Sequence, residues 1–480
     1  MKVALLVALL LVAGAGPSRT AAAQEQMSVA PPRPTLQAPA SGPFLGGVPS
    51  GTATDGVQTI TVVQALTRAL EHNLGVLTAE DNLGRAQGAR RRALSELLPN
   101  VNGRVGETRQ VINLAAFGFG GADSPFPTLS AIVGPFNVFD ARVYLSQSLL
   151  DFGALNDARA EAHKVQAARL LSKGARDFVL YVAGTLYVQA LAMSARADAA
   201  RAQQETSEAL HTPAVNLKQN GVIAGIDVLR SEVQLNTQRQ RVTIAENEFE
   251  KSKLRLARAI GLPLGQKFAL DPALPVLPAA DMSLDQAVER AYATRPDYLA
   301  AQERIRAAEA TRRAIVGDAL PSVRLNADYG DIGLSPSDSH ATYSVAGAVT
   351  IPIFQGGRTR GRLLEADADL RSRRAEAEDL KASIYYEIRE AFLDLDATSK
   401  QLAVAGNARD LAAQQLTQAR DRFAAGVASN IEVVQAQDAV AVATEQFIAA
   451  QYGYDLAKGA LSRGLGTAEQ LLRQILGGPR

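Results

Sequence analysis

The strongest constraint on the fold of this chain is an internal repeat. Residues 60–106 and 282–328 align without a gap at an offset of 222. This frame places Gln64, Ala65, Arg68, Ala69, Leu77, Ala86, Arg90, Arg91, Leu98, Pro99 and Val101 over Gln286, Ala287, Arg290, Ala291, Leu299, Ala308, Arg312, Arg313, Leu320, Pro321 and Val323. Each copy predicts a helix that ends at Leu-Pro and leads into an alternating strand. Such a duplication favours an assembled rod or tube over a single globular enzyme.

A second pair of matched segments interrupts the long helical patterns of the two halves. The pair consists of QNGVIAGIDVLRSE (219–232) and AAGVASNIEVVQAQ (424–437), which align at an offset of 205. Each segment leads into a further helix, expected over about 226–260 and 431–465. Gly261 and Gly466 follow these helices and are expected to cap their C-terminal ends.

Very long helices are predicted on the other side of each interruption. Residues 154–211 contain no proline and follow a helical pattern throughout, which corresponds to a rod of roughly 90 Å. Residues 357–424 give a helix of similar length. Apolar and small residues at heptad-like spacing favour coiled-coil packing of these helices: Ile384, Ile388, Ala391, Leu395, Thr398, Leu402 and Ala405.

Four segments alternate between apolar and polar residues, which is typical of β-strands. Hairpins are expected over about 99–150 and 321–354, with strands near 101–106, 141–149, 323–329 and 343–351 and a loop over 112–138. Alternation over about ten residues is also typical of transmembrane strands. A half-buried hairpin of a soluble domain would show the same pattern.

The N-terminus and the composition indicate export. Residues 1–23 resemble a cleavable signal peptide, and residues 24–57 form a Pro/Gly-rich tether. Removing Lys2 and Arg19 with the signal changes the formal charge from +1 to −1, which argues against a nucleic-acid partner. The chain has no cysteine and therefore no disulfides. Its most apolar internal segment, Phe178–Met193, is interpreted as a buried stretch of a longer helix.

Four strands cannot close a barrel by themselves. If they lie in a membrane, the open sheet edges leave backbone groups unsatisfied in lipid, so the chain must assemble with further copies. Two copies supply eight strands and three supply twelve; eight leave little lumen, whereas twelve leave a conduit. Composition alone leaves both numbers open.

The duplicated helix–Leu-Pro–strand units and the two interruption motifs resemble the TolC-like outer-membrane efflux proteins, over about residues 58–467. The resemblance implies an α+β membrane protein: a homotrimer with a 12-stranded outer-membrane barrel, four strands per chain, continuous with a periplasmic barrel of coiled-coil helices. It implies a passive exit duct for drugs, small molecules or exported proteins in tripartite efflux or type I secretion. The implied partners are a periplasmic adaptor, an inner-membrane transporter and outer-membrane lipid.

The expected organisation follows the two halves. It comprises the signal peptide (1–23), the tether (24–57), a first repeat (58–262) with its tip near 213–226, a linker (263–281), a second repeat (282–467) with its tip near 425–431, and a C-terminal tail (468–480).

The resemblance also implies an acidic periplasmic gate just after each tip. By position Glu432 matches the first acidic gate residue, whereas Gln435 departs from the second and weakens the expected ring of charge. Asp227 and Arg230 occupy the matching positions of the first half. The alternative is that Asp227 and Glu432 are helix N-terminal acids stabilised by the helix dipole.

The adaptor-docking residues implied by the resemblance are Gly221 and Val222 at the first tip and Gly426 and Val427 at the second. The glycines can alternatively be explained by turn geometry with positive φ, and both explanations can hold together.

No enzymatic chemistry, metal or cofactor is expected. The four histidines, His72, His163, His211 and His340, show no metal-ligand spacing,. The chain contains no G-x-S-x-G, Walker A or HExxH motif. The competing hypothesis is an exported coiled-coil scaffold or adhesin that never enters a membrane.

Overall fold

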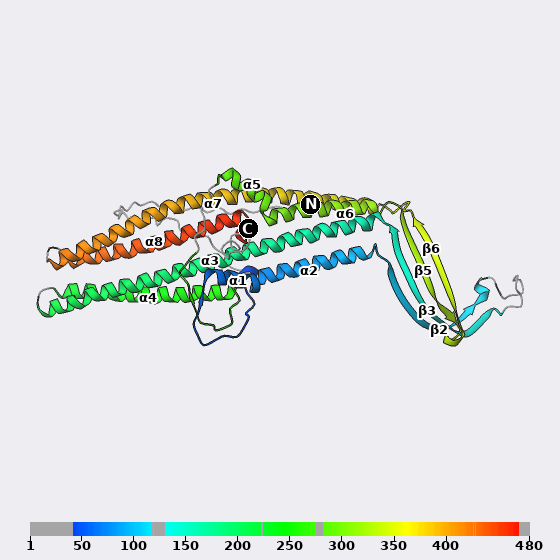
Figure 1. Cartoon of the computed structure of the whole chain (residues 1–480), viewed down its shortest axis with the longest axis horizontal. Helices are drawn as coiled ribbons and strands as arrows, with labels where there is room; N and C mark the ends of the chain where they lie inside the picture. The colour runs from blue at the N-terminus through cyan, green and yellow to red at the C-terminus, as the bar shows by residue number, and fades with distance from the viewer. Residues whose placement is uncertain are drawn as a thin grey trace, which may run out of the picture. The chain divides into compact units, whose positions relative to one another are not determined.

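The computed structural model describes residues 42–117, 119, 130–221, 224–274, 282–425, 427 and 429–469. The chain divides into two units, Met1–Ala38 and Pro39–Arg480, and only the second is described below. The expected signal peptide lies outside the described residues, as do residues 24–41 of the expected tether and 470–480 of the expected tail. The described part combines long helices with one four-stranded sheet (Figure 1), so the prediction of an α+β chain is confirmed.

The helix that precedes each Leu-Pro is broken into two pieces, where a single helix was predicted. The pieces are α1 (Val62–His72), α2 (Leu74–Ser95), α5 (Leu284–Thr294) and α6 (Pro296–Gly317). Their bounds match at the sequence offset of 222. Thr61 with Gln64, and Ser283 with Gln286, form the same reciprocal capping box at the start of α1 and α5,.

The two breaks occur at equivalent residues, Asn73 and Arg295, and have different causes. The Asn73 side chain accepts a hydrogen bond from Gly75 N at 2.9 Å and so caps α2. Arg295 precedes Pro296, and the proline ring disfavours helical backbone at the residue before it. Both breaks were missed: Pro296 marked the second in the sequence, whereas Asn73 gave no comparable signal for the first.

Four longer helices form two antiparallel hairpins. They are α3 (Phe152–Gln219) with α4 (Gly225–Ala259), and α7 (Arg358–Ala424) with α8 (Asn430–Gly464). The first long helix was expected over 154–211, but α3 continues through Pro213 to Gln219. Gly261 (φ 62°) and Gly466 (φ 64°) follow the returning helices in the left-handed conformation that favours a C-terminal glycine.

The largest hydrophobic core joins α1, α3 and α4 to the linker between the halves. Strand β1 (Gln58–Ile60) pairs in parallel with β4 (Phe268–Leu270). Tyr187 of α3 is fully buried, and its hydroxyl lies 2.9 Å from the carbonyl of Ile60 and 2.7 Å from that of Asp271. Burial raises the pKa of Tyr187 to about 12. The start of the first half and the linker are thus anchored to one buried side chain.

The sheet joins the two halves through its central strands. It contains β2 (Asn100–Asn113), β3 (Ile132–Leu150), β5 (Ser322–Gly333) and β6 (Ser339–Thr350), all antiparallel and in the order β2-β3-β5-β6. The predicted loop over 112–138 is therefore too long at its C-terminal end. Phe136–Val138 pair with Thr108–Gln110, although Gly134 and Pro135 obscured the strand pattern in the sequence.

The described end of the expected tether packs on the helices instead of extending away from them. Pro43–Leu45 forms a short 3-10 helix. The Phe44 ring meets that of Phe178 edge to face at 4.8 Å, and the Phe44 carbonyl accepts a hydrogen bond from the Asn73 amide at 2.8 Å. Phe44 and Leu45 supply apolar contacts that the surrounding Pro/Gly composition did not suggest.

Among the described residues, one helix is long and apolar enough to cross a membrane by composition. Helix α3 contains an 18-residue window with a mean hydropathy of 1.5, of which 56% is buried inside the chain. Val179, Tyr187 and Ala190 are fully buried within the expected segment Phe178–Met193. Burial of this kind is typical of a core helix and agrees with the sequence interpretation.

Candidate functional site

One face of the sheet is apolar and open to the surroundings. We call it the apolar face; on β5 and β6 it carries Val323, Leu325, Ala327, Tyr329, Tyr343, Val345 and Val349. Tyr343 is 77% exposed, Val345 67% and Val105 of β2 75%. A contiguous exposed apolar patch is rare on soluble monomers and typically marks a surface that binds a membrane or another protein.

The opposite face carries a hydrogen-bonded polar network, and we call it the polar face. Arg142 of β3 donates from Nε to Asp140 at 3.2 Å and from Nη2 to Thr342 of β6 at 2.9 Å, and it also pairs with Asp328 of β5. Ser146 donates to Asn326 at 2.9 Å. Apolar and polar residues therefore alternate across the same strands, as in strands that separate lipid from an aqueous lumen.

Both outer strands of this sheet, β2 and β6, have a neighbour on one side only within the described chain. Each strand therefore presents one row of backbone N–H and C=O groups without a sheet partner. In lipid these groups cost several kcal/mol each, so a membrane-embedded sheet of this kind requires strands from further copies.

The predicted gate acids occupy the same place in two helices. Asp227 is the third residue of α4 and Glu432 the third of α8. Their N–H groups donate to the carbonyls of Ala224 and Ser429, both at 3.1 Å. Neither helix has a side-chain cap at its start, so an acid in the first turn stabilises the exposed N–H groups there.

The two acids have different cation partners. Glu432 Oε1 lies 3.1 Å from Nε of Arg422 on α7, across the turn, whereas Asp227 pairs with Arg230 of its own helix at 3.3 Å. At the offset of 205, Arg422 corresponds to Leu217 and Arg230 corresponds to Gln435. Each half thus carries its cation at a position that is uncharged in the other.

The expected docking residues are described only in part. Gly221 has φ +72°, and its N–H donates to the Lys218 carbonyl at 3.0 Å, so turn geometry explains this glycine. Val427 is 69% exposed, and its N–H donates to the Arg422 carbonyl at 2.9 Å. Val222 and Gly426 lie outside the described residues.

The two hairpins contact each other close to their tips. Leu210 of α3 packs against a buried cluster formed by Leu416, Ala419, Val433 and Ala436. Gln234 of α4 donates to Asp438 of α8 at 3.0 Å. The gate acids therefore lie just beyond a packed junction between the hairpins.

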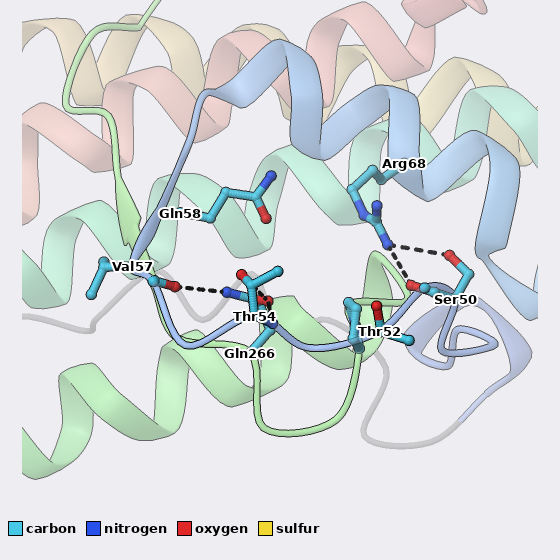
Figure 2. A pocket seen from close by; sticks show the side chains of 10 residues that line it. Ser50, Thr52, Thr54, Val57, Gln58, Arg68 and Gln266 are labelled. Carbon is cyan, nitrogen blue, oxygen red and sulfur yellow. Dashed lines mark hydrogen bonds between the residues drawn. The ribbon is translucent and has the colours of Figure 1, made fainter.

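A pocket of about 420 Å³ lies where the N-terminal segment crosses α1 (Figure 2). Arg68 donates from Nη2 to the Gly261 carbonyl at 2.9 Å and to Ser50 Oγ at 3.3 Å. The Gln266 side chain accepts from Thr54 N at 2.8 Å. These bonds hold residues 50–57 against the end of α4. The alignment had placed Arg68 over Arg290 but suggested no role for it.

Three of the four histidines contact separate neighbours. His72 contacts Ser50 at 2.9 Å, His163 contacts Glu303 at 2.7 Å and His211 contacts Ser231 at 2.8 Å. Within the described ranges, no group of three or more His, Asp or Glu side chains could hold a metal ion.

Comparison with known proteins adds independent information. Residues 287–467 match the family model described as outer membrane efflux protein. The pyoverdine export outer membrane protein OpmQ of Pseudomonas putida is 24% identical over 345 residues, which cover 68% of this chain and 70% of the relative. The outer membrane efflux protein BepC of Brucella suis is 25% identical over 356 residues, which cover 69% of this chain and 74% of the relative.

The fold has close counterparts among solved structures. The CmeC outer membrane channel of Campylobacter jejuni superposes with a TM-score of 0.75 at 16% identity, covering 92% of this chain and 97% of that one. The structural agreement shows that the chain has the fold of this outer membrane channel, its residues 287–467 match the outer membrane efflux protein family, and the two relatives are outer-membrane export and efflux proteins.

Proposed function

We propose that this protein is the outer-membrane exit duct of a tripartite efflux or type I secretion system. Cargo would pass from the periplasm to the outside through a lumen lined by the polar face of the sheet. The observation that carries the proposal is the pairing of an exposed apolar face with open outer strands. Lipid would cover the apolar face, and strands of neighbouring copies would pair with the open outer strands.

The strand lengths support a membrane position for the sheet. Strands β5 and β6 contain 12 residues each, and a transmembrane strand tilted by about 45° needs about 9–11 residues. Tyr329 and Tyr343 pair across these strands on the apolar face. Aromatic residues in that position are typical of the girdles at the edges of a membrane barrel.

The proposed assembly is a homotrimer with twelve strands. Strand β2 of each copy would pair with β6 of the next, which leaves no open edge in the lipid. Eight strands from two copies would enclose a lumen filled by side chains, whereas twelve leave room for cargo. The twelve long helices would continue this conduit into the periplasm, and the matching halves of the chain would let each hairpin occupy a similar position in the wall.

The periplasmic end is proposed to hold the gate and the adaptor contacts. Three copies of Glu432 would form a ring of charge, weakened by Gln435 and balanced locally by Arg422. Asp227 and Arg230 would form the matching pair on the other hairpin. Gly221, Val222, Gly426 and Val427 would meet a periplasmic adaptor, and an inner-membrane transporter would supply the energy.

The duct itself is proposed to perform no chemistry and to need no cofactor. The two relatives described above are named for export or efflux. Drugs, small molecules and exported proteins all remain possible cargo, because in such systems the transporter selects what enters. The exported-scaffold hypothesis offers no explanation for large apolar side chains open on one face of the sheet.

The proposal is tested by extraction followed by reconstitution. We expect the protein in the outer-membrane fraction, released only by detergent, and discrete conductance steps in a planar bilayer. An exported scaffold would instead appear in the soluble periplasmic fraction. Folded protein that needs no detergent and gives no conductance would contradict the proposal.

A further inference from the structure

The polar face of the sheet carries more positive than negative charge. Over the paired stretches 100–110, 136–148, 322–332 and 340–350, its charged residues are Arg104, Arg142, Arg324, Asp140 and Asp328. Three cations against two anions give a net charge of +1 per chain at this face, with His340 taken as neutral.

Arg142 pairs with both acids on this face, and the three side chains together carry a net charge of −1. It pairs with Asp140 beside it on β3 and with Asp328 on β5. Only 14% of its side chain is exposed, and its Nη2 group donates to Thr342 Oγ1. Arg142 and its two acids are therefore part of the structure of the sheet, and they add no positive charge to the space in front of it.

Arg104 and Arg324 are placed differently. Arg104 is exposed on β2, and its register partner is Arg142, a like charge. Arg324 lies opposite Ser148 and Ala348, both uncharged. The positive charge that reaches the solvent comes from these two residues.

We infer that the outer-membrane section of the duct favours anionic cargo, and that Arg104 and Arg324 set this preference. The inference rests on the proposed function, because only a closed barrel turns the polar face into a lumen. Three copies would present three Arg104 and three Arg324 side chains to passing solutes. Rings of arginine are a known means of attracting anions in pores. The favoured compounds would carry carboxylate, phosphate or sulfate groups.

A local probe is needed, since whole-channel conductance would also report the acidic tip. The chain contains no cysteine, so a single introduced thiol is a specific reporter. Asn102 lies on the polar face two residues from Arg104, and Val105 lies on the apolar face of the same strand. We would place Asn102→Cys protein in lipid nanodiscs. Its reaction rates with the anionic sulfonatoethyl and the cationic trimethylammonioethyl methanethiosulfonate reagents would then be measured.

The expected result is a rate ratio that depends on arginine charge. One unit charge about 8 Å away in water changes the local concentration of a monovalent ion about two- to threefold, in opposite directions for the two signs. Arg104→Gln should therefore lower the anionic-to-cationic rate ratio at Asn102→Cys about fivefold. Arg104→Lys should preserve the ratio, and Arg324→Gln should lower it less. Arg109→Gln, on the apolar face of β2, is the matched control and should leave it unchanged.

Two other results of the thiol experiment would have different meanings. In the first, Val105→Cys is protected and Asn102→Cys reacts, but neither arginine substitution changes the rate ratio. That result would overturn the charge preference and leave the duct intact. Equal reactivity of Val105→Cys and Asn102→Cys would show that lipid does not cover the apolar face. That result would overturn the proposed function and the inference together.

Discussion

Glu432 of α8 and Arg422 of α7 form an ion pair across the second tip, with Oε1 and Nε 3.1 Å apart. Both side chains are about half exposed, so the pair contributes about 0–1 kcal/mol to stability. The pair matters because it reduces the net negative charge at the proposed gate. Arg422 offsets the acid that the family resemblance assigns to the gate.

Removing Arg422 should make the tip more attractive to cations. In Arg422→Gln the Glu432 carboxylate keeps its charge and loses its partner. For a trivalent cation such as La³⁺, removing one opposing charge about 8 Å away corresponds to roughly tenfold tighter block of the reconstituted channel. Glu432→Gln should shift the block in the opposite direction. The measurement is the half-blocking concentration in single-channel recordings.

The control for this prediction is Lys400→Gln. Lys400 pairs with Asp396 on the same helix at 2.6 Å, and it lies 22 residues before Arg422, roughly 33 Å along the helix. Its loss should not change the block. Identical half-blocking concentrations for wild type and Arg422→Gln would refute a role for Glu432 at the gate.

An acidic residue at Val427 should disrupt adaptor docking without disturbing the fold. Val427 is 69% exposed at the second tip, so Val427→Asp buries no charge within the chain. A carboxylate in an apolar contact with an adaptor would be desolvated, which costs several kcal/mol. We expect export activity to be lost while detergent-stable oligomers form normally.

Leu264→Asp is the matched control for Val427→Asp. Leu264 is 83% exposed and lies in the loop after α4, away from the tips. The Leu264→Asp protein should retain export activity. Normal export by Val427→Asp in a strain that depends on this protein would contradict docking at that tip.

The sheet makes a prediction that compares neighbouring residues of β6. Val345 lies on the apolar face and Ser344 on the polar face. A lysine on the lipid face near the bilayer midplane destabilises a barrel by about 2–4 kcal/mol, whereas the lumen tolerates it. Val345→Lys should therefore reduce the yield of membrane-inserted oligomer strongly and Ser344→Lys only slightly. Equal yields, measured by gel mobility without boiling, would argue against lipid on the apolar face.

Much of this architecture was predictable from local chemistry. Gly261 and Gly466 marked the ends of the returning helices because both residues adopt positive φ there. Alternation along β5 and β6 identified both strands, since each face has one kind of environment. These features depend on residues close together in the sequence.

What escaped prediction depends on contacts distant in the sequence or on ambiguous residues. The break at Asn73 is held by its bonds to Phe44 and Ala259, neither of which lies in its own helix. The pairing of Glu432 with Arg422 appears only once α7 and α8 fold back on each other. Pro213 suggested an early helix end, yet α3 continues because proline removes a single donor and packing on α4 persists,.

The last prediction concerns Asp177, which is buried on α3 near the C-terminal end of the described chain. Its side chain is 6% exposed, and Oδ1 accepts a hydrogen bond from Glu469 N at 2.9 Å. Within the described residues, Oδ2 has no hydrogen-bond partner. Burial raises the pKa of Asp177 above its usual value, despite the opposing effect of that hydrogen bond.

The sign of the pH dependence follows from linkage. Because the folded chain holds the Asp177 proton more tightly than the unfolded chain, stability decreases as pH rises from the unfolded pKa to the folded pKa. Above the folded pKa the full cost of the buried charge persists. Asp177→Asn keeps the accepting oxygen and removes this charge. It should therefore raise the unfolding temperature in detergent at pH 7, and the gain should shrink below about pH 4. An unfolding temperature that falls at pH 7, or a gain independent of pH, would mean that the ionised carboxylate is favourably bound.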